Sequence, residues 1–243
     1  ENYNILEFQQ ISNSFNEMTV RIETLIKEVY ETQLLVKEAR LQYLQAQINP
    51  HFMFNVLTMI AIKVKKHRDE ELYQTVTSFA GLMRGKLFRR NEVEIKLKEE
   101  MEIAGFYLYL QSERFKDIIT YNIEWESDEI KECYVPRLCI EPIVENAVIH
   151  GLEPKGTEGR IRVAIREASE DSINIVVEDD GVGFNVNEMD DRKDNKNPRV
   201  GVMNIQRLIR NLYGDKYGVL FQSEIGKGTI VTVCLPMRKD RTV

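Results

Sequence analysis

Apolar side chains recur every three or four residues along the first third of the chain, which is the spacing of one face of a long helix. This seam holds one polar position and consists of Phe15, Met18, Ile22, Leu25, Val29, Thr32, Val36, Ala39, Tyr43 and Ala46. A second stripe, which indicates a helix packed on two sides, consists of Leu34, Leu41 and Ile48. Pro50 lacks an amide donor and predicts a kink, after which the apolar spacing resumes to about Val64.

A second helix is predicted to begin after Asp69, because an aspartate suits the N-cap position of a helix. Its apolar face consists of Leu72, Val76, Phe79, Met83 and Leu87. Two helices of one chain cannot bury this much apolar surface between them. We therefore expect a homodimer in which two helical hairpins form a four-helix bundle.

The rest of the chain predicts a mixed α/β domain. Helices are expected at about 97–115, from Pro136 as first helical residue to about His150, and at 201–212. Alternation of apolar and polar residues predicts strands at 119–125, 161–165, 173–177, 219–222 and 230–235. Between Asn185 and Arg199 the chain is polar, and a loop of that length predicts a mobile lid.

Composition narrows the classes of function. The net charge of -6 and the pI near 5.4 argue against a general nucleic-acid binder, although residues 201–243 carry more bases than acids and favour an anionic ligand. Three cysteines without metal-ligand spacing are typical of reduced thiols in a cytosolic protein. No apolar run reaches the roughly 18–20 residues that span a bilayer, and no signal peptide is found. As given, the chain is expected to be soluble.

Three short segments of the α/β domain carry candidate chemistry. Glu178 to Phe184 (EDDGVGF) ends a strand with an acid and two alternating glycines, which let a flat ligand approach the backbone; a simple acidic turn is the alternative. Glu145 to Gly151 (ENAVIHG) places Asn146 and His150 on one helix face. The amide oxygen there suits Mg²⁺ and the imidazole suits a phosphate, whereas an ordinary helix C-cap is the alternative. Gly226 to Thr229 (GKGT) opens the last strand or forms a plain hairpin turn.

In this order the segments resemble the N, G1, G2 and G3 boxes of the Bergerat-fold ATPase superfamily, which includes gyrase, heat-shock chaperones and histidine kinases. The resemblance implies an α/β-sandwich domain in which Asp179 binds the adenine amino group of ATP and Asn146 coordinates Mg²⁺. It also implies nucleotide contacts from a further set of residues, namely His150, Lys155, Gly181, Gly183, Gly201, Gly226, Gly228 and Thr229.

Two positions depart from the superfamily pattern. The G2 box, Arg199-Val200-Gly201, keeps only its second glycine, so the geometry of the lid does not follow from the resemblance. Gyrase-like ATPases carry a glutamate four residues before the asparagine of the N box, where this chain has Pro142. That difference favours transfer of the phosphoryl group to another nucleophile over hydrolysis.

The nucleophile is predicted within Gln47 to Asn55 (QINPHFMFN). A neutral imidazole is a competent nucleophile near neutral pH, and Asn55 lies one helical turn after His51, where it could orient the ring. A kinked bundle helix with one core histidine is the alternative.

The acceptor segment resembles the Pro-His-Phe-x-Phe-Asn motif of LytS/YesM-type sensor histidine kinases. The likeness also includes residues 92–115 and 142–154, and it extends over about 40–237. Commoner histidine kinases have an acid after the histidine, whereas this chain has Phe52. The general base is therefore left open between Glu141 and Glu145.

Residues 7–28 are similar to the second helix of a HAMP signalling module, with a generic coiled coil as the alternative. The expected α+β organisation is a HAMP-like helix at 1–28, dimerisation and phosphoacceptor helices forming a hairpin or coiled coil at 29–92, and the ATP-binding domain at 93–243. The resemblance implies Mg-ATP-dependent autophosphorylation of His51 and transfer of the group to an aspartate of a response regulator. It also implies a membrane-spanning parent protein whose cytoplasmic portion is this chain.

Two rival functions remain at this point. A Bergerat-fold ATPase would use hydrolysis to drive a conformational change. A degenerate kinase would act as a dimeric signalling scaffold and bind no ATP.

Overall fold

The computed structural model describes residues 18, 21–22, 24–27, 29–30, 33, 50–66, 68–87, 92–116, 118–169, 171–185 and 198–241. They belong to two units, residues 1–51 and 52–243. In the first unit the described positions between 18 and 33 are helical, as predicted, and the seam side chains among them are exposed in the single chain. Residues 34–49, which lead into the predicted kink at Pro50, and most of the HAMP-like positions lie outside the described residues. Within the described ranges, no helix combines the length and apolarity needed to cross a bilayer.

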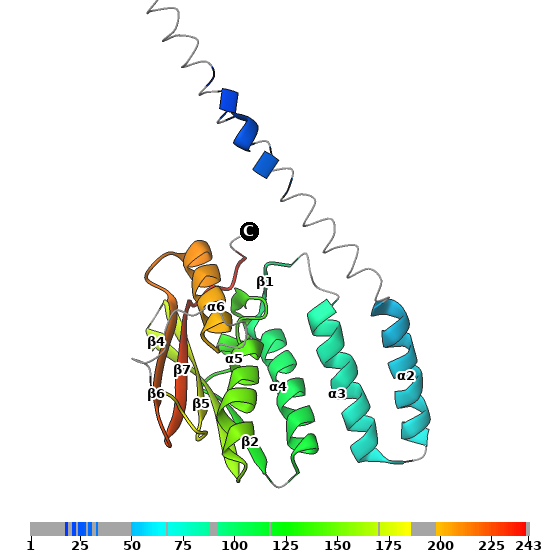
Figure 1. Ribbon diagram of the computed structural model, residues 1–243. Coiled ribbons are helices and arrows are strands. Elements are labelled where there is room, and N and C mark those ends of the chain that lie inside the picture. Colours follow the sequence, from blue (N-terminus) through cyan, green and yellow to red (C-terminus); the bar gives the residue numbers. More distant parts are fainter. Residues whose placement is uncertain are drawn as a thin grey trace, which may run out of the picture. The chain divides into compact units, whose positions relative to one another are not determined.

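Two helices, α2 (Pro50–Lys66) and α3 (Glu70–Leu87), form a hairpin (Figure 1). The Asp69 carboxylate accepts a hydrogen bond from the amide of Leu72 at 3.0 Å, which confirms the predicted N-cap. A cation–π contact also links the two helices, because the Arg84 guanidinium of α3 lies 3.9 Å from the centre of the Phe54 ring of α2.

Helix α3 contacts α4 (Leu97–Arg114) through small residues rather than through its apolar face. A Cβ atom on Gly81 would lie 2.4 Å from the Phe106 ring, and one on Gly85 would lie 2.6 Å from Ile103. Any larger residue would therefore require the facing side chain of α4 to move. Leu72 and Phe79 of the predicted apolar face remain 46% and 40% exposed. The single chain leaves these two side chains largely exposed, whereas Val76, Met83 and Leu87 are half-buried, and the four-helix bundle stays a prediction.

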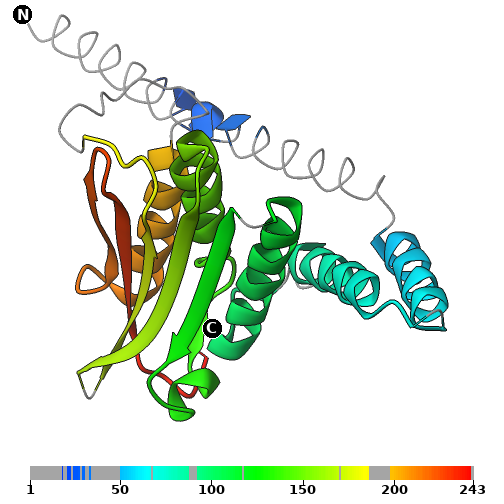
Figure 2. The same cartoon turned by 90° about the horizontal axis from the view of Figure 1, so that it is seen from below.

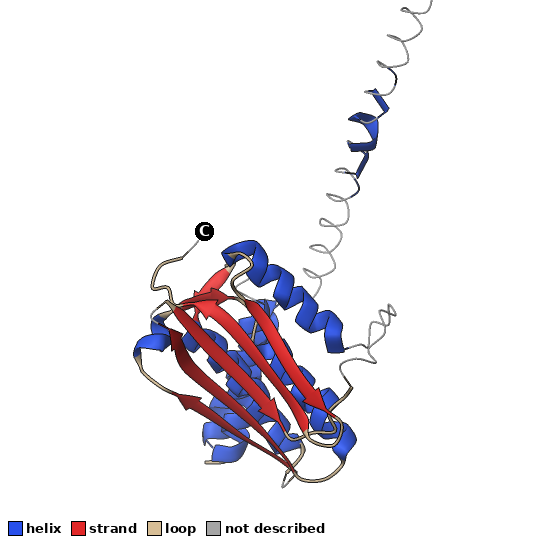
Figure 3. Cartoon of the chain, turned by 90° about the vertical axis from the view of Figure 1, so that its left-hand side faces the viewer, coloured by secondary structure: helices blue, strands red, loops and turns tan. Residues whose placement is uncertain are grey.

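Five strands form one sheet in the order β2-β4-β5-β7-β6. Their bounds are β2 Ile119–Trp125, β4 Gly159–Ser169, β5 Ser172–Asp179, β6 Gly218–Glu224 and β7 Gly228–Pro236. β2 and β4 are parallel, and every other neighbouring pair is antiparallel. Helices α4, α5 (Glu141–Asn146) and α6 (Pro198–Tyr213) cover one face, and no described helix covers the other (Figures 2 and 3). This is the predicted α/β sandwich.

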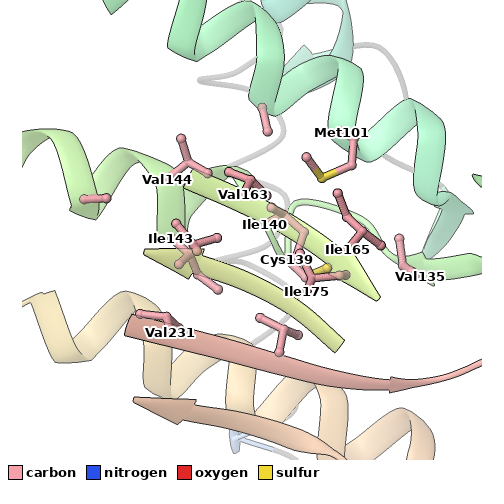
Figure 4. Packing of buried hydrophobic residues seen from close by; sticks show 14 of the residues in the cluster. Met101, Val135, Cys139, Ile140, Ile143, Val144, Val163, Ile165, Ile175 and Val231 are labelled. Carbon is pink, nitrogen blue, oxygen red and sulfur yellow. The ribbon is translucent and has the colours of Figure 1, made fainter. Parts of the chain in front are cut away.

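The core of the sandwich follows the alternation of the strands. Ile161, Val163 and Ile165 of β4 and Ile173, Ile175 and Val177 of β5 are at most 1% exposed. Figure 4 shows several of them packed against side chains of α4 and α5, including Met101, Ile143 and Val144. Burial of each such side chain is favourable by roughly 1.5–3 kcal/mol, so this layer positions the helices that border the site.

The predicted helix from Pro136 to His150 begins later than expected. Pro136 ends β3 (Tyr134–Pro136), which pairs with β1 (Glu94–Lys96) in a separate two-stranded sheet. Helix α5 begins only at Glu141, with Pro142 in its first turn, and it continues as the π-helical turn η2 (Ala147–Leu152) and the 3-10 turn η3 (Glu153–Lys155). The prediction was wrong because pairing with a distant strand, which local sequence does not reveal, holds Pro136 in an extended conformation.

The other helices and strands predicted for the α/β domain are confirmed, most of them with longer bounds. A 3-10 turn, η1 (Glu129–Glu132), lies between β2 and β3 and was not predicted. Helix α6 begins at Pro198, three residues before the predicted start, at a position where proline is favoured because its missing amide costs nothing. Residues 186–197, most of the predicted lid, lie outside the described residues.

Candidate functional site

A pocket lies between the end of α5, the π-helical turn and strands β5, β6 and β7. It is lined by Ile143, Asn146, Ala147, His150, Gly151, Val177, Asp179, Gly183, Phe184, Val202, Phe221, Thr229 and Val231. The fold thus brings together five residues of the predicted site: Asn146, His150, Asp179, Gly183 and Thr229. Apolar walls with a few polar groups are typical of sites for flat organic ligands.

Asp179 ends β5 and is the one acid among the described residues that line the pocket. It is 6% exposed, and its carboxylate accepts a hydrogen bond from the amide of Gly181 at 2.9 Å. Burial raises the pKa of Asp179 to about 6, although the amides of Gly181 and Thr229 oppose this shift. At neutral pH the group is therefore a buried acceptor for a ligand donor.

The pocket lining continues from Asn146, the last residue of α5, into the π-helical turn, which contributes Ala147, His150 and Gly151. Such turns are frequent at functional sites. The helix runs on through Gly151, so the alternative in which His150 is an ordinary C-cap before a helix-ending glycine is wrong. Gly151 has a different role, because a Cβ there would lie 2.7 Å from a carboxylate oxygen of Asp179.

The glycines of the acidic strand end and of the last hairpin allow close backbone contacts. A Cβ on Gly181 would lie 2.4 Å from the carbonyl carbon of Gly151, and the next amide, of Val182, donates to that carbonyl at 3.0 Å. Gly228 has a φ of +100°, and a Cβ there would lie 1.9 Å from the carbonyl oxygen of Asp179. The GKGT segment is therefore a hairpin turn that also fixes the backbone of Asp179.

Replacement of Gly228 by alanine should destabilise the domain more than replacement of Gly226. Both residues have positive φ, which costs an alanine about 1–2 kcal/mol. A Cβ on Gly226 meets nothing within 4 Å, whereas a Cβ on Gly228 collides with backbone. Urea unfolding of the two variants measures the difference, and equal losses would show that the close contact at Gly228 is not needed.

Other predicted site residues lie around the pocket rather than in its lining. A Cβ on Gly201 of α6 would lie 3.6 Å from the Asn146 amide nitrogen, so α6 passes beside Asn146. Lys155 pairs with Asp180 at 3.0 Å, and Glu145 is half-buried. Glu141, the other candidate base, is buried and pairs with Lys86 at 2.7 Å, which favours a structural role.

The predicted acceptor segment lies on another element. His51 belongs to the first turns of α2, and its side chain lies outside the described part of the structure. Asn55 is exposed on the same helix. The acceptor role of His51 stays a prediction.

Sequence reasoning missed the apolar lining of the pocket and Gly151. Val177 and Val231 lie two residues from Asp179 and Thr229 on their strands, so strand alternation would have placed them on the same face. Phe184 follows the glycine motif directly, and its ring packs on Phe221 with centroids 6.3 Å apart. That contact joins segments distant in sequence, which local patterns do not reveal.

Comparisons with known proteins agree with this architecture. Residues 39–119 match the histidine kinase family model, and residues 136–239 match the family of histidine kinase-, DNA gyrase B- and HSP90-like ATPases. The chain is 32% identical to the sensor histidine kinase YesM of Bacillus subtilis over 96% of this chain and 40% of that protein. It is 29% identical to the sensor histidine kinase YpdA of Escherichia coli (85% and 37%) and 28% identical to the sensor protein LytS of Oceanobacillus iheyensis (89% and 37%).

The chain spans about two fifths of the length of these curated relatives. Both family models are found in the order that the sequence predicted, with the kinase segment before the ATPase segment. The chain belongs to the histidine kinase family and is of the LytS/YesM type.

Proposed function

We propose that this chain binds Mg-ATP in the pocket and transfers the γ-phosphoryl group to His51. The observation that carries the proposal is the pocket itself, in which a buried carboxylate at the end of β5 shares an apolar cavity with the amide of Asn146 at the end of α5. The family matches support ATP binding by this domain.

Asp179 would accept a hydrogen bond from the exocyclic amino group of adenine. When ionised, this carboxylate can only accept hydrogen bonds, and it is buried, so a base without a donor at that position would leave part of its acceptor capacity unused. The apolar walls, including Ile143, Val177 and Phe221, would contact the two faces of the ring. This arrangement would select adenine over guanine, which presents a carbonyl oxygen at the equivalent position.

Asn146 would hold Mg²⁺. The described residues contain no cluster of three or more His, Cys, Asp or Glu side chains arranged to bind a metal. The residues nevertheless fit this ion, since Mg²⁺ keeps several waters and is usually held by one or two protein oxygens together with substrate phosphates. When bound, Mg²⁺ would neutralise charge on the phosphates. His150, which also lines the pocket, would contact a phosphate oxygen.

The reaction would be an in-line displacement at the γ-phosphorus. A bond from an imidazole nitrogen of His51 forms as the bond to the leaving oxygen of ADP breaks, and the imidazole proton passes to a base. The phosphoramidate product is reactive, so the group would pass on to an aspartate of a response regulator. Asn55 would orient the His51 ring, and Glu145 is our candidate for the base.

The test is incubation with γ-labelled ATP and Mg²⁺, followed by mapping of the labelled residue. Label on histidine should survive alkali and be lost in mild acid, because protonation of the phosphoramidate nitrogen makes it a good leaving group. Release of phosphate without labelled protein would instead support an ATPase. Acid-stable label would contradict the proposal.

The proposed protein is a homodimer held together by the hairpin, and it belongs to a membrane-spanning parent through segments outside this chain. Domain limits of 1–28, 29–92 and 93–243 stay part of the proposal, as does the lack of a nucleic-acid partner.

Replacement of Leu72 by glutamate should dissociate the dimer. Leu72 lies on the uncovered face of α3, where an unpaired charge buried in a dimer would cost several kcal/mol. Leu220, which is 70% exposed on β6, provides a matched control. Light scattering should give twice the chain mass for the parent chain and Leu220→Glu, and one chain mass for Leu72→Glu. A monomeric parent chain would rule out the bundle.

A further inference from the structure

The segment that leads into α5 is held by a carboxylate from another helix. Glu100 of α4 is fully buried. One of its oxygens accepts a hydrogen bond from the amide of Leu138 and the other from the amide of Ile140, both at 2.9 Å. A buried carboxyl group is tolerated only when it is well paired, so this group is committed to the amides of this segment, which also include that of Glu141.

The loop needs an outside partner because it has little support of its own. Leu138 has a φ of +56°, which is uncommon for a residue with a branched side chain. Ile140 occupies the N-cap position of α5 and has no side chain able to cap the helix. Glu100 therefore supplies from α4 the acceptors for the amides of Leu138 and Ile140.

The position of this loop determines the position of Asn146. Helix α5 has six residues, so Asn146 lies about 9 Å from Ile140 along the helix axis. Ile143 and Val144 between them are at most 1% exposed, and a packed helix of this length shifts as a rigid body. A displacement of its first turn would therefore be transmitted to the amide that faces the pocket.

We propose that Glu100 is a positioning residue for the metal-dependent part of nucleotide binding. This inference rests on the proposed role of Asn146 in holding Mg²⁺. Asp179 is on β5 and belongs to a different element, so its hydrogen bond to adenine does not depend on Glu100. Of the ring contacts named above, from Ile143, Val177 and Phe221, only that of Ile143 comes from α5. Loss of Glu100 should thus weaken the contribution of Mg²⁺ to affinity and spare most of the contribution of the base.

The simpler alternative is that Glu100 only stabilises the fold. Cys139 offers a matched control for it, because it lies in the same loop, is fully buried, and donates none of the hydrogen bonds to Glu100. Cys139→Ala should lower stability by leaving a small cavity without moving the amides of the loop. Glu102, exposed on the same helix, controls for the change of charge.

The experiment measures ATP affinity by calorimetry in Mg²⁺ and in EDTA for the whole chain and for Glu100→Gln, Cys139→Ala and Glu102→Gln. In Glu100→Gln we expect the gain in affinity from Mg²⁺ to fall about tenfold, as when partners of metal ligands are removed, with affinity in EDTA within about twofold of the parent chain. The two control variants should keep the full gain. An unchanged gain in Glu100→Gln, or an equal loss in Cys139→Ala, would overturn the inference.

The experiment also distinguishes failure of the proposed role of Asn146 and failure of Glu100→Gln to fold. If the parent chain binds ATP equally well with and without Mg²⁺, then the proposed role of Asn146 fails and this inference fails with it. If Glu100→Gln does not fold, Glu100→Asp keeps the carboxyl group but shortens its reach by one methylene. The same Mg²⁺-selective loss is expected there, and its absence would contradict the positioning role.

Discussion

Replacement of His51 by glutamine is expected to abolish incorporation of label from γ-labelled ATP while leaving ATP affinity unchanged. Glutamine keeps a polar side chain of similar length, but its amide nitrogen is not a nucleophile because its lone pair is delocalised. Among the described residues, those that line the proposed nucleotide pocket come from α5 onwards, and none belongs to α2. Autoradiography and calorimetry on the same preparation measure the two properties.

A control for this result is His150→Gln. His150 lines the pocket, so its loss should weaken phosphate contacts and slow labelling without removing the acceptor. Mixing the His51→Gln chain with an Asn146→Ala chain should restore labelling if transfer crosses the dimer, and should not if it stays within one chain. Undiminished labelling of His51→Gln would remove His51 from the reaction.

Replacement of Asp179 by asparagine should change stability and binding in opposite directions. The pKa of Asp179 is raised from 3.8 to about 6, chiefly by burial, so the folded chain holds this proton more tightly than the unfolded chain does. The ionised carboxylate therefore costs stability, and the cost grows between about pH 4 and pH 6 and is complete above that. A shift of about two pKa units corresponds to on the order of 3 kcal/mol.

Asparagine carries no charge at any pH, and its oxygen can still accept the hydrogen bond from Gly181. We expect the nucleotide-free Asp179→Asn chain to be more stable than the parent chain at pH 7.5, by up to that amount, and to lose this advantage near pH 4. Its ATP affinity should fall roughly ten- to a hundredfold, because a hydrogen bond to a charged group contributes about 1.5–3 kcal/mol. Denaturant unfolding at several pH values and calorimetry provide the two measurements.

Asp180 provides the matched control. It is adjacent in sequence, but it pairs with Lys155 at 3.0 Å and is about half exposed. Asp180→Asn should lose a little stability, since an exposed ion pair contributes at most about 1 kcal/mol, and should bind ATP normally. If both variants lose affinity equally, the adenine contact is not at Asp179.

Much of this fold was predictable because its determinants are local. The N-cap at Asp69 and the strand alternation around Ile161 and Ile173 each depend on residues within a few positions of one another. Pro136 was misplaced because its conformation depends on pairing with β1 and on the loop that follows, which Glu100 holds from about 40 positions away. Nothing within ten residues of Pro136 contains that information.

The residues of the candidate site also fall into those that the sequence predicted and those that depend on distant contacts. Asn146, His150 and Asp179 were recognisable because the family whose motifs they resemble brings those motifs together in one site. The fold does place them around one pocket. Gly151 was not recognised as part of that site. Only a glycine fits there because Asp179, 28 positions later, occupies the space that a side chain would need. Lys155 was also part of the predicted site, yet it pairs with Asp180 and is not among the described residues that line the pocket.

The order of strands has a consequence for the timing of folding. β7, the last strand in the sequence, lies in the interior of the sheet between β5 and β6, and its Thr229 pairs with Asp179. Contacts of such large sequence separation form late, because a long loop must close before they gain any energy. During synthesis, the segment from β2 to β5 would emerge with one edge of the growing sheet unpaired. The proposed nucleotide pocket would therefore remain incomplete until β7 has joined the sheet, because Thr229 and Val231 of that strand line it.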